Sequence, residues 1–164
     1  MGLNLSLEGK HALVCGASSG IGYATAQVLG SLGATLTVVA RRAQRLEKLL
    51  TELQKSGVKQ TQLIALDLDE GSAATDAILK KAHALAPVEI LINNAGGPPG
   101  GALLEAESET FITGFHRHVL ASQRLVQGCL ESMRASGYGR IINIISTSVR
   151  EPIPGLGVSN TIRG

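Results

Sequence analysis

The stretch GASSGIG at residues 16–22 decides the fold of this 164-residue chain. It follows the apolar run His11–Cys15, which is typical of a buried strand, and it opens a helical pattern over Ile21–Leu32. A second buried strand, Ala34–Ala40, follows, so a complete strand-helix-strand unit surrounds the glycines. This position disfavours the alternative that residues 16–22 are an ordinary turn between a strand and a helix.

Each glycine of the GxxxGxG spacing has its own purpose. Gly16 permits a tight turn, Gly20 lets a diphosphate approach the backbone, and Gly22 lets the helix pack closely on the strand. The start of the helix offers free N–H groups and a positive dipole end to phosphate groups. The stretch therefore predicts a dinucleotide-binding turn.

The alternation of apolar runs and helical patterns continues to residue 145. Further helices are expected over Ala43–Ser56 and Ser72–Ala86, and further strands over Gln62–Leu66, Glu89–Asn93 and Arg140–Ile145. A long helix is expected to begin at Ser108, with one face formed by Phe111, Phe115, Val119, Ser122, Val126, Cys129 and Met133. Strands bridged by helices pair in parallel through right-handed crossovers. The sequence therefore predicts an α/β fold, a Rossmann-type doubly wound parallel sheet, as a single domain over residues 1–164.

Composition excludes several classes of protein. The chain carries 15 basic and 13 acidic side chains, a net charge of +2, and four aromatic residues, two Phe and two Tyr. A nucleic-acid surface needs more positive charge and more rings for base stacking. No apolar run approaches the roughly 18 residues of a membrane span. We expect a cytoplasmic protein with no nucleic-acid or membrane partner and, since Cys15 and Cys129 lack Cys or His neighbours, no metal.

Five motifs in chain order carry a family resemblance. They are Leu7–Lys10 before the first strand, CGASSGIG at residues 15–22, Asp67 after the third strand, NNAG at residues 93–96 and GRIINIIS at residues 139–146. Together they resemble the short-chain dehydrogenase/reductase (SDR) family over nearly the whole chain, with Cys15 where the family has Thr. The resemblance implies a dinucleotide-dependent oxidoreductase.

The end of the second strand predicts the choice of dinucleotide. An NAD enzyme needs a carboxylate there for the ribose 2′-hydroxyl, but the chain has Ala40, followed by Arg41 and Arg42. A guanidinium fork matches a 2′-phosphate in geometry and charge, which favours NADP over NAD. The alternative is that both arginines merely charge the first turn of the next helix, where the helix dipole disfavours them.

The resemblance also implies roles for residues after the third and fourth strands. Asp67 is expected to meet the adenine amine, although a solvated carboxylate before a helix stays an alternative. Asn93, Ala95 and Gly96 are expected to line the adenosine and ribose. The cofactor-binding residues predicted are Gly16, Ser18, Ser19, Gly20, Ile21, Gly22, Arg41, Arg42, Asp67, Leu68, Asn93, Ala95 and Gly96.

The catalytic positions depart from the family, in which a Tyr gives the proton, a Lys four residues on lowers the Tyr pKa, a Ser orients the carbonyl and an Asn anchors a relay water. Ser146 matches the Ser. Ser159 and Arg163 stand at the Tyr and Lys positions, so SxxxR replaces YxxxK, and His118 stands at the Asn position.

These replacements differ in what they can supply. Ser159 is a poor acid, because a serine hydroxyl is far weaker than a Tyr, whose pKa is about 10. Arg163 can hold ribose hydroxyls but cannot give up its proton. His118 titrates near neutrality and can deliver a proton through water. The alternative is that His118 is simply tolerated on the helix.

The resemblance further implies a sixth strand after Gly164, since family members run to about 250 residues. Without that strand, Arg140–Ile145 would end the sheet as a flat apolar edge. We expect a homo-oligomer, a dimer or tetramer, and a chain of 164 residues that associates when alone. In that chain, residues 159–164 are expected to lack fixed structure, with Arg163 unable to hold a ribose.

The sequence thus predicts an NADP-dependent SDR with an altered active site, acting on a small carbonyl compound or alcohol. One alternative is a dinucleotide-binding protein without turnover, a sensor or partner subunit, which SxxxR favours. Another is an inert part of a longer enzyme.

Overall fold

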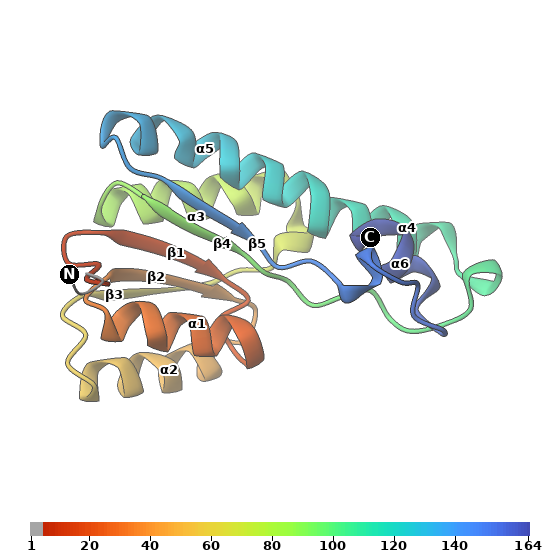
Figure 1. The fold of residues 1–164 in the computed structure, drawn as a ribbon, viewed down its shortest axis with the longest axis horizontal. Coiled ribbons are helices and arrows are strands. Elements are labelled where there is room, and N and C mark those ends of the chain that lie inside the picture. Colours follow the sequence, from red (N-terminus) through yellow and green to blue (C-terminus); the bar gives the residue numbers. More distant parts are fainter. Residues whose placement is uncertain (1–4) are drawn as a thin grey trace.

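The computed structural model describes residues 5–164 and contains one parallel five-stranded sheet. The strands are β1 (His11–Cys15), β2 (Thr35–Ala40), β3 (Thr61–Ala65), β4 (Ile90–Asn93) and β5 (Arg140–Asn143), in the order β3-β2-β1-β4-β5. Helices α1 (Gly20–Ser31) and α2 (Ala43–Lys55) cover one face, and α3 (Ser72–Leu85) and α5 (Ala121–Ala135) cover the other (Figure 1). The predicted doubly wound α/β fold is confirmed.

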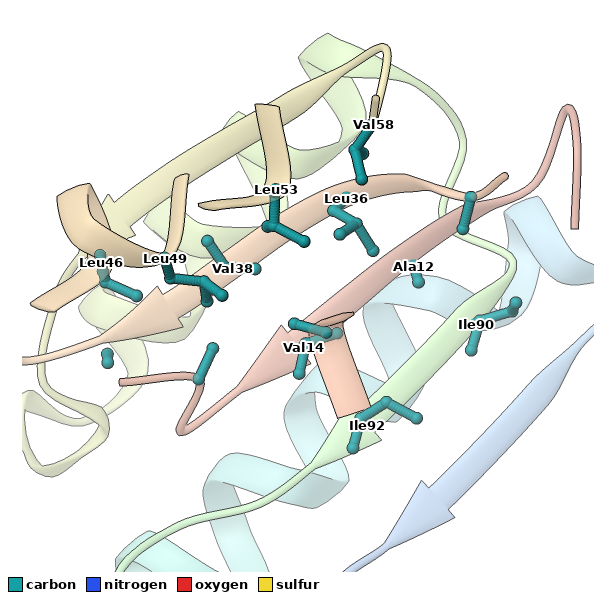
Figure 2. Close-up of a cluster of buried hydrophobic side chains, with 14 residues drawn as sticks. Ala12, Val14, Leu36, Val38, Leu46, Leu49, Leu53, Val58, Ile90 and Ile92 are labelled. Atoms are coloured by element: carbon teal, nitrogen blue, oxygen red, sulfur yellow. The ribbon is translucent and has the colours of Figure 1, made fainter. Parts of the chain in front are cut away.

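The core lies in two layers because residues of a strand alternate between the sheet faces. In β1, Ala12 and Val14 join the cluster under α1 and α2 (Figure 2). Leu13 and Cys15 join the cluster under α3 and α5. Helix α2 contributes Leu46, Leu49 and Leu53, which are almost fully buried. Their helical spacing is the signal that predicted this helix.

The order of the strands creates the crevice in which the site lies. β1 pairs with β2 on one side and with β4 on the other, so the chain moves outward in opposite directions from β1. At such a switch point, the segments that leave the carboxyl ends of the strands diverge and leave room for a ligand.

The expected long helix from Ser108 contains an irregular segment. Helix α4 (Ser108–Phe115) passes into a π-helical segment, η3 (His116–Leu120), before α5 begins. The expected apolar face of Phe111, Phe115, Val119, Ser122, Val126, Cys129 and Met133 is therefore wrong in its first half, because the wider π turn rotates the face. Phe115 and Val119 are exposed, whereas α5 buries Ala121, Leu125, Cys129 and Met133.

The end of the chain is structured, against expectation. Helix α6 (Gly157–Arg163) packs beside α4 and buries Val158 and Ser159 (Figure 1). Asn160 ties it down, because its Oδ1 accepts from the Ile153 N–H at 3.2 Å and its Nδ2 donates to the Ile153 carbonyl at 2.9 Å. Within residues 5–164, no helix has the length and apolar character needed to cross a membrane.

Candidate functional site

A pocket of about 360 Å³ opens at the carboxyl ends of the strands, at the switch point of the sheet. Its volume lies within the range of about 300–1,000 Å³ that ligand sites occupy. The lining residues are Gly16, Ser18, Ser19, Ile21, Val39, Ala40, Arg41, Arg42, Leu66, Asp67, Leu68, Asn94, Ala95, Gly96, Arg117, Ile144, Ile145 and Arg163. Strand β2 and the segments that follow the other four strands therefore supply parts of the wall.

The glycine-rich turn between β1 and α1 has the geometry that a diphosphate requires. Gly16 and Gly20 have positive φ values of 62° and 58°, which favour glycine. A Cβ on Gly22 would overlap the Gly16 carbonyl oxygen, so Gly22 allows close packing of helix on strand. A Cβ on Gly20 would meet only open space, which leaves room for a ligand. Gly20 and Gly22 thus shape the turn without lining the pocket.

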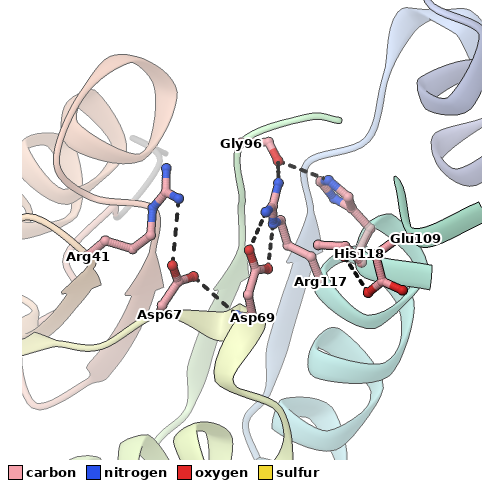
Figure 3. A network of polar contacts seen from close by, with 8 residues as sticks. Arg41, Asp67, Asp69, Gly96, Glu109, Arg117 and His118 are labelled. Carbon is pink, nitrogen blue, oxygen red and sulfur yellow. Dashed lines mark hydrogen bonds and ion pairs between the residues drawn. The ribbon is translucent and has the colours of Figure 1, made fainter. Parts of the chain in front are cut away.

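Positive charge stands at the end of β2, as the sequence predicts. Arg42 Nη2 donates to Ser18 Oγ at 3.3 Å and to Ser19 Oγ at 3.5 Å, so this guanidinium lies over the glycine-rich turn. Arg41 Nη1 lies 3.6 Å from Asp67 Oδ2 and is largely exposed (Figure 3). Because Ala40 carries no carboxylate, this part of the pocket attracts an anion.

Asp67 has a local task as well as a place in the pocket. Its Oδ1 accepts from the Asp69 N–H at 3.1 Å and caps η1 (Leu68–Glu70), a short 3₁₀ helix. Asp67 and Leu68 both line the pocket. The two interpretations of Asp67, a cap and a pocket residue, are therefore compatible.

Asn93 does not line the main pocket, against expectation. Asn93 lies in β4 and its Nδ2 donates to Asn143 Oδ1 of β5 at 2.8 Å. The next residue, Asn94, lines the pocket instead, and its Nδ2 donates to the carbonyls of Cys15 and Gly16 at 3.3 and 3.4 Å. Sequence reasoning missed Asn94, although it belongs to the same NNAG motif.

A second, smaller chamber of about 60 Å³ separates the expected catalytic residues. His118 and Arg163 line it, and Arg163 also reaches the main pocket, against the expectation that its end of the chain lacks fixed structure. Ser146 and Ser159 line neither cavity. Ser146 Oγ accepts from the Ser148 N–H at 3.1 Å, and Ser159 is buried with 2% of its surface exposed. The structure thus groups His118 with Arg163 and leaves both serines aside.

Arg117 lines the pocket and pairs with Asp69, and sequence reasoning missed both residues. Arg117 Nε donates to Asp69 Oδ1 at 2.6 Å and its Nη2 pairs with Asp69 Oδ2, which makes a two-pronged ion pair (Figure 3). Arg117 Nη1 also donates to the Gly96 carbonyl at 3.3 Å. The hydrogen bonds from Arg117 lower the pKa of Asp69, and those to Asp69 raise the pKa of Arg117. The basic run of residues 116–118 was the available signal.

His118 shares the Gly96 carbonyl with Arg117. Its Nε2 lies 3.1 Å from the Gly96 oxygen. Burial lowers the pKa of His118 below its ordinary value of 6.5, and the positive charges of Arg163 and Arg117 lower it further. The imidazole is therefore neutral at neutral pH.

The comparisons agree with this fold and site. The family model for short chain dehydrogenases matches residues 10–158, so the chain belongs to the short-chain dehydrogenase family. A short chain dehydrogenase of Pseudocercospora fijiensis is 36% identical over 151 residues, which cover 90% of this chain and 48% of that protein. The 3-oxoacyl-(acyl-carrier-protein) reductase FabG of Pseudomonas aeruginosa is 37% identical over 142 residues, covering 85% of this chain and 56% of that protein.

Solved structures give the same family. L-sorbose reductase from Gluconobacter frateurii, in complex with NADPH and L-sorbose, superposes with a TM-score of 0.92 at 31% identity. The match covers 98% of this chain and 61% of that one. The chain thus spans about half to three fifths of the relatives that it matches.

Proposed function

We propose that residues 1–164 form one NADP-binding domain of an SDR oxidoreductase that interconverts a small carbonyl compound and an alcohol. The observation that carries the proposal is the pocket itself. It combines a glycine-rich turn open to a ligand with two arginines at the end of β2, where NAD enzymes need a carboxylate. The NADPH complex of the similar L-sorbose reductase supports the same choice of dinucleotide.

The residues around the pocket divide into phosphate, adenosine and ribose groups. The turn at residues 16–22 would hold the diphosphate, and Arg41 and Arg42 would hold the 2′-phosphate. Asp67, Leu68, Ala95 and Gly96 would line the adenosine, and Arg163 would reach the nicotinamide ribose from α6. When bound, NADP supplies the hydride acceptor or donor of the reaction.

A second candidate function is dinucleotide binding without turnover. Two observations favour it: Ser159 at the Tyr position is buried away from both cavities, and Ser146 is engaged as the cap of a short 3₁₀ helix. Neither hydroxyl lines the pocket or the smaller chamber. Of the four residues expected to be catalytic, only His118, which lines the chamber, can titrate near neutral pH. Such a protein would act as a sensor or a partner subunit.

The cofactor assignment is tested by the Arg41→Ala variant. Loss of a charge-assisted contact to the 2′-phosphate should weaken NADPH binding by about 1–3 kcal/mol and leave NADH binding nearly unchanged. Calorimetric titration of the wild type and the variant measures both. An equal loss for the two dinucleotides would indicate that Arg41 does not meet the 2′-phosphate.

An activity assay separates the two candidate functions. NADPH consumption is followed over a panel of aldehydes and ketones, and NADP reduction over secondary alcohols, with this chain and with a longer form that includes the last third of the family domain. Turnover by the longer form supports the oxidoreductase. Tight NADPH binding without turnover by either form supports the sensor or partner subunit.

A further inference from the structure

We infer that Arg117 and Asp69 are positioning residues that hold His118 with its proton on Nε2, so that Nδ1 accepts a proton from an alcohol. This inference rests on the proposed function and gives it a direction: at neutral pH the site is arranged for alcohol oxidation. His118 then acts as a base, whereas the sequence suggested an acid.

The Gly96 carbonyl fixes the tautomer of His118. Its oxygen lies 3.1 Å from Nε2 and can only accept a hydrogen bond, so Nε2 must carry a hydrogen. In the neutral ring, the lone pair is then on Nδ1. Because both ring nitrogens carry protons only in the imidazolium, the neutral ring has one acceptor atom and its identity is set.

Arg117 holds that carbonyl in place. Its two-pronged ion pair with Asp69 joins η3 to η1, and its remaining Nη1 donates to the same Gly96 oxygen at 3.3 Å (Figure 3). A planar guanidinium bound to a carboxylate through two atoms has little freedom to rotate. The π-helical segment lets two consecutive residues, Arg117 and His118, reach one carbonyl.

The charges around His118 keep it neutral. Arg163 faces it from α6, Arg117 from its own segment and Asp69 from η1, and the two guanidinium groups outweigh the one carboxylate. Burial acts in the same direction and is the largest cause, whereas the hydrogen bond with the Gly96 carbonyl acts against it; together these effects lower the pKa of His118 below 6.5. At pH 7 the lone pair of Nδ1 is therefore available.

The small chamber beside His118 gives the proton a route. Asn93 Oδ1 and Arg163 Nε are both buried without a hydrogen-bond partner in the described part of the chain, and both residues line this chamber with His118. Buried polar atoms of this kind bind ordered water, and about 60 Å³ accommodates it. Water in the chamber can carry the proton from the substrate hydroxyl to His118 and from there outward.

The proposed step balances as an oxidation. The substrate O–H bond would break and its proton would pass through water in the chamber to Nδ1 of His118. The carbinol C–H bond would break, its hydrogen and electron pair would go to an oxidised nicotinamide dinucleotide, and a C=O bond would form. The alcohol is oxidised and the dinucleotide is reduced. A histidine whose pKa is lowered then passes the proton readily to water.

Nitrogen-15 NMR of histidine-labelled protein tests the tautomer without any turnover. His118→Asn assigns the His118 resonances among the four histidines of the chain. We expect a pyrrole-type Nε2 and a pyridine-type Nδ1 at pH 7, and a titration midpoint below 6.5. In Arg117→Met the midpoint should rise and both tautomers should appear, because a positive charge is lost and the Asp69 carboxylate is freed.

Arg117→Lys is the matched control, since it keeps the charge and loses the two-pronged geometry. It should restore the low midpoint but not the single tautomer. A proton on Nδ1 in the wild type, or an Arg117→Met spectrum identical to that of the wild type, would overturn the inference. The NMR experiment contains no NADP, so it tests the tautomer independently of the proposed function. Failure of the protein to bind a dinucleotide would contradict the proposed function without changing the NMR result.

Discussion

Gly22 and Gly96 are expected to matter for different reasons, Gly22 for the stability of the fold and Gly96 for dinucleotide binding. A Cβ on Gly22 would overlap the carbonyl oxygen of Gly16 and lie 2.8 Å from its carbon, and this backbone cannot move aside. Gly22→Ala should therefore lower the free energy of unfolding by about 1–3 kcal/mol, the usual cost of overpacking. Urea denaturation measures this change.

Gly96 is the matched control, because a Cβ there meets nothing within 4 Å. Gly96→Ala should keep the free energy of unfolding within about 0.5 kcal/mol of the wild type. It should nevertheless weaken NADPH binding about tenfold, about 1.4 kcal/mol, because the methyl group enters the pocket. A strongly destabilised Gly96→Ala with unchanged binding would contradict this division.

Single substitutions distinguish the two candidate proton carriers, His118 and Ser159. His118→Ala should lower kcat by about 10²–10⁴, the usual worth of general acid–base catalysis, whereas Ser159→Ala should have little effect. The reason is that His118 lines the chamber, while Ser159 is buried outside both cavities. Steady-state kinetics of the longer form would measure both. A larger loss in Ser159→Ala would identify the hydroxyl as the proton carrier.

The sequence predicted residues whose roles depend on near neighbours in the chain and missed those whose roles depend on distant contacts. The glycine spacing and the pair Arg41 and Arg42 were found because their roles depend on neighbours within one strand-helix unit. The pair of Asp69 and Arg117 was missed, since its members are 48 positions apart and meet only when η1 and η3 pack together. Asn93 and Asn94 were confused because their orientation depends on where β4 ends.

Strand β1 begins with a buried histidine that makes the stability of the sheet depend on pH. His11 Nδ1 donates to the Ala86 carbonyl at 2.9 Å, and Nε2 lies 2.9 Å from the Thr37 hydroxyl. Burial lowers the pKa of His11 below 6.5 in the folded protein. Below that value the unfolded chain binds more protons than the folded one, so stability falls as the pH falls, until the folded pKa is passed.

His11→Gln tests this dependence. A glutamine keeps a donor and an acceptor but does not titrate, so the loss of unfolding free energy between pH 7.5 and pH 5.5 should be smaller in the variant than in the wild type. Urea denaturation at the two pH values measures the difference, and other histidines cancel in the comparison. An equal loss in both proteins would show that His11 contributes nothing to the pH dependence.

Secondary structure followed from periodicity wherever the elements were regular. Helix α2 was predicted from Leu46, Leu49 and Leu53, and it ends within a residue of the expected place. The π-helical segment η3 was not predicted, because five residues are too few to show a π-helical periodicity of apolar side chains. Residues 159–164 were expected to lack fixed structure, but helix α6 is held by the burial of Val158 and Ser159 and by the hydrogen bonds between Asn160 and Ile153.

At the scale of the whole molecule, β5 is the exposed edge of the described sheet. Ile141 and Ile142 are 38% and 48% exposed, whereas Ile144 is partly buried against the core and so does not belong to the expected flat apolar edge. An unpaired apolar strand is a template for another chain. A polypeptide of residues 1–164 studied alone should therefore associate, which light scattering would detect as a mass above that of a monomer.

A charged residue on that edge should reverse the association. Ile142→Lys places a charge beside the unpaired strand and should restore a monomer. Val28→Lys is the matched control, since Val28 is 57% exposed on α1, away from the edge, and should leave the association unchanged. A monodisperse wild-type monomer that unfolds cooperatively would mean that the five strands suffice as a fold.

Titration of the wild-type protein with NADPH and with NADH, by calorimetry in one buffer, tests the central claim most directly. Ala40 offers no carboxylate to a ribose hydroxyl, and Arg41 and Arg42 offer positive charge to a 2′-phosphate. NADPH should bind more tightly than NADH by about 1–3 kcal/mol. Equal affinities, or tighter binding of NADH, would contradict the account.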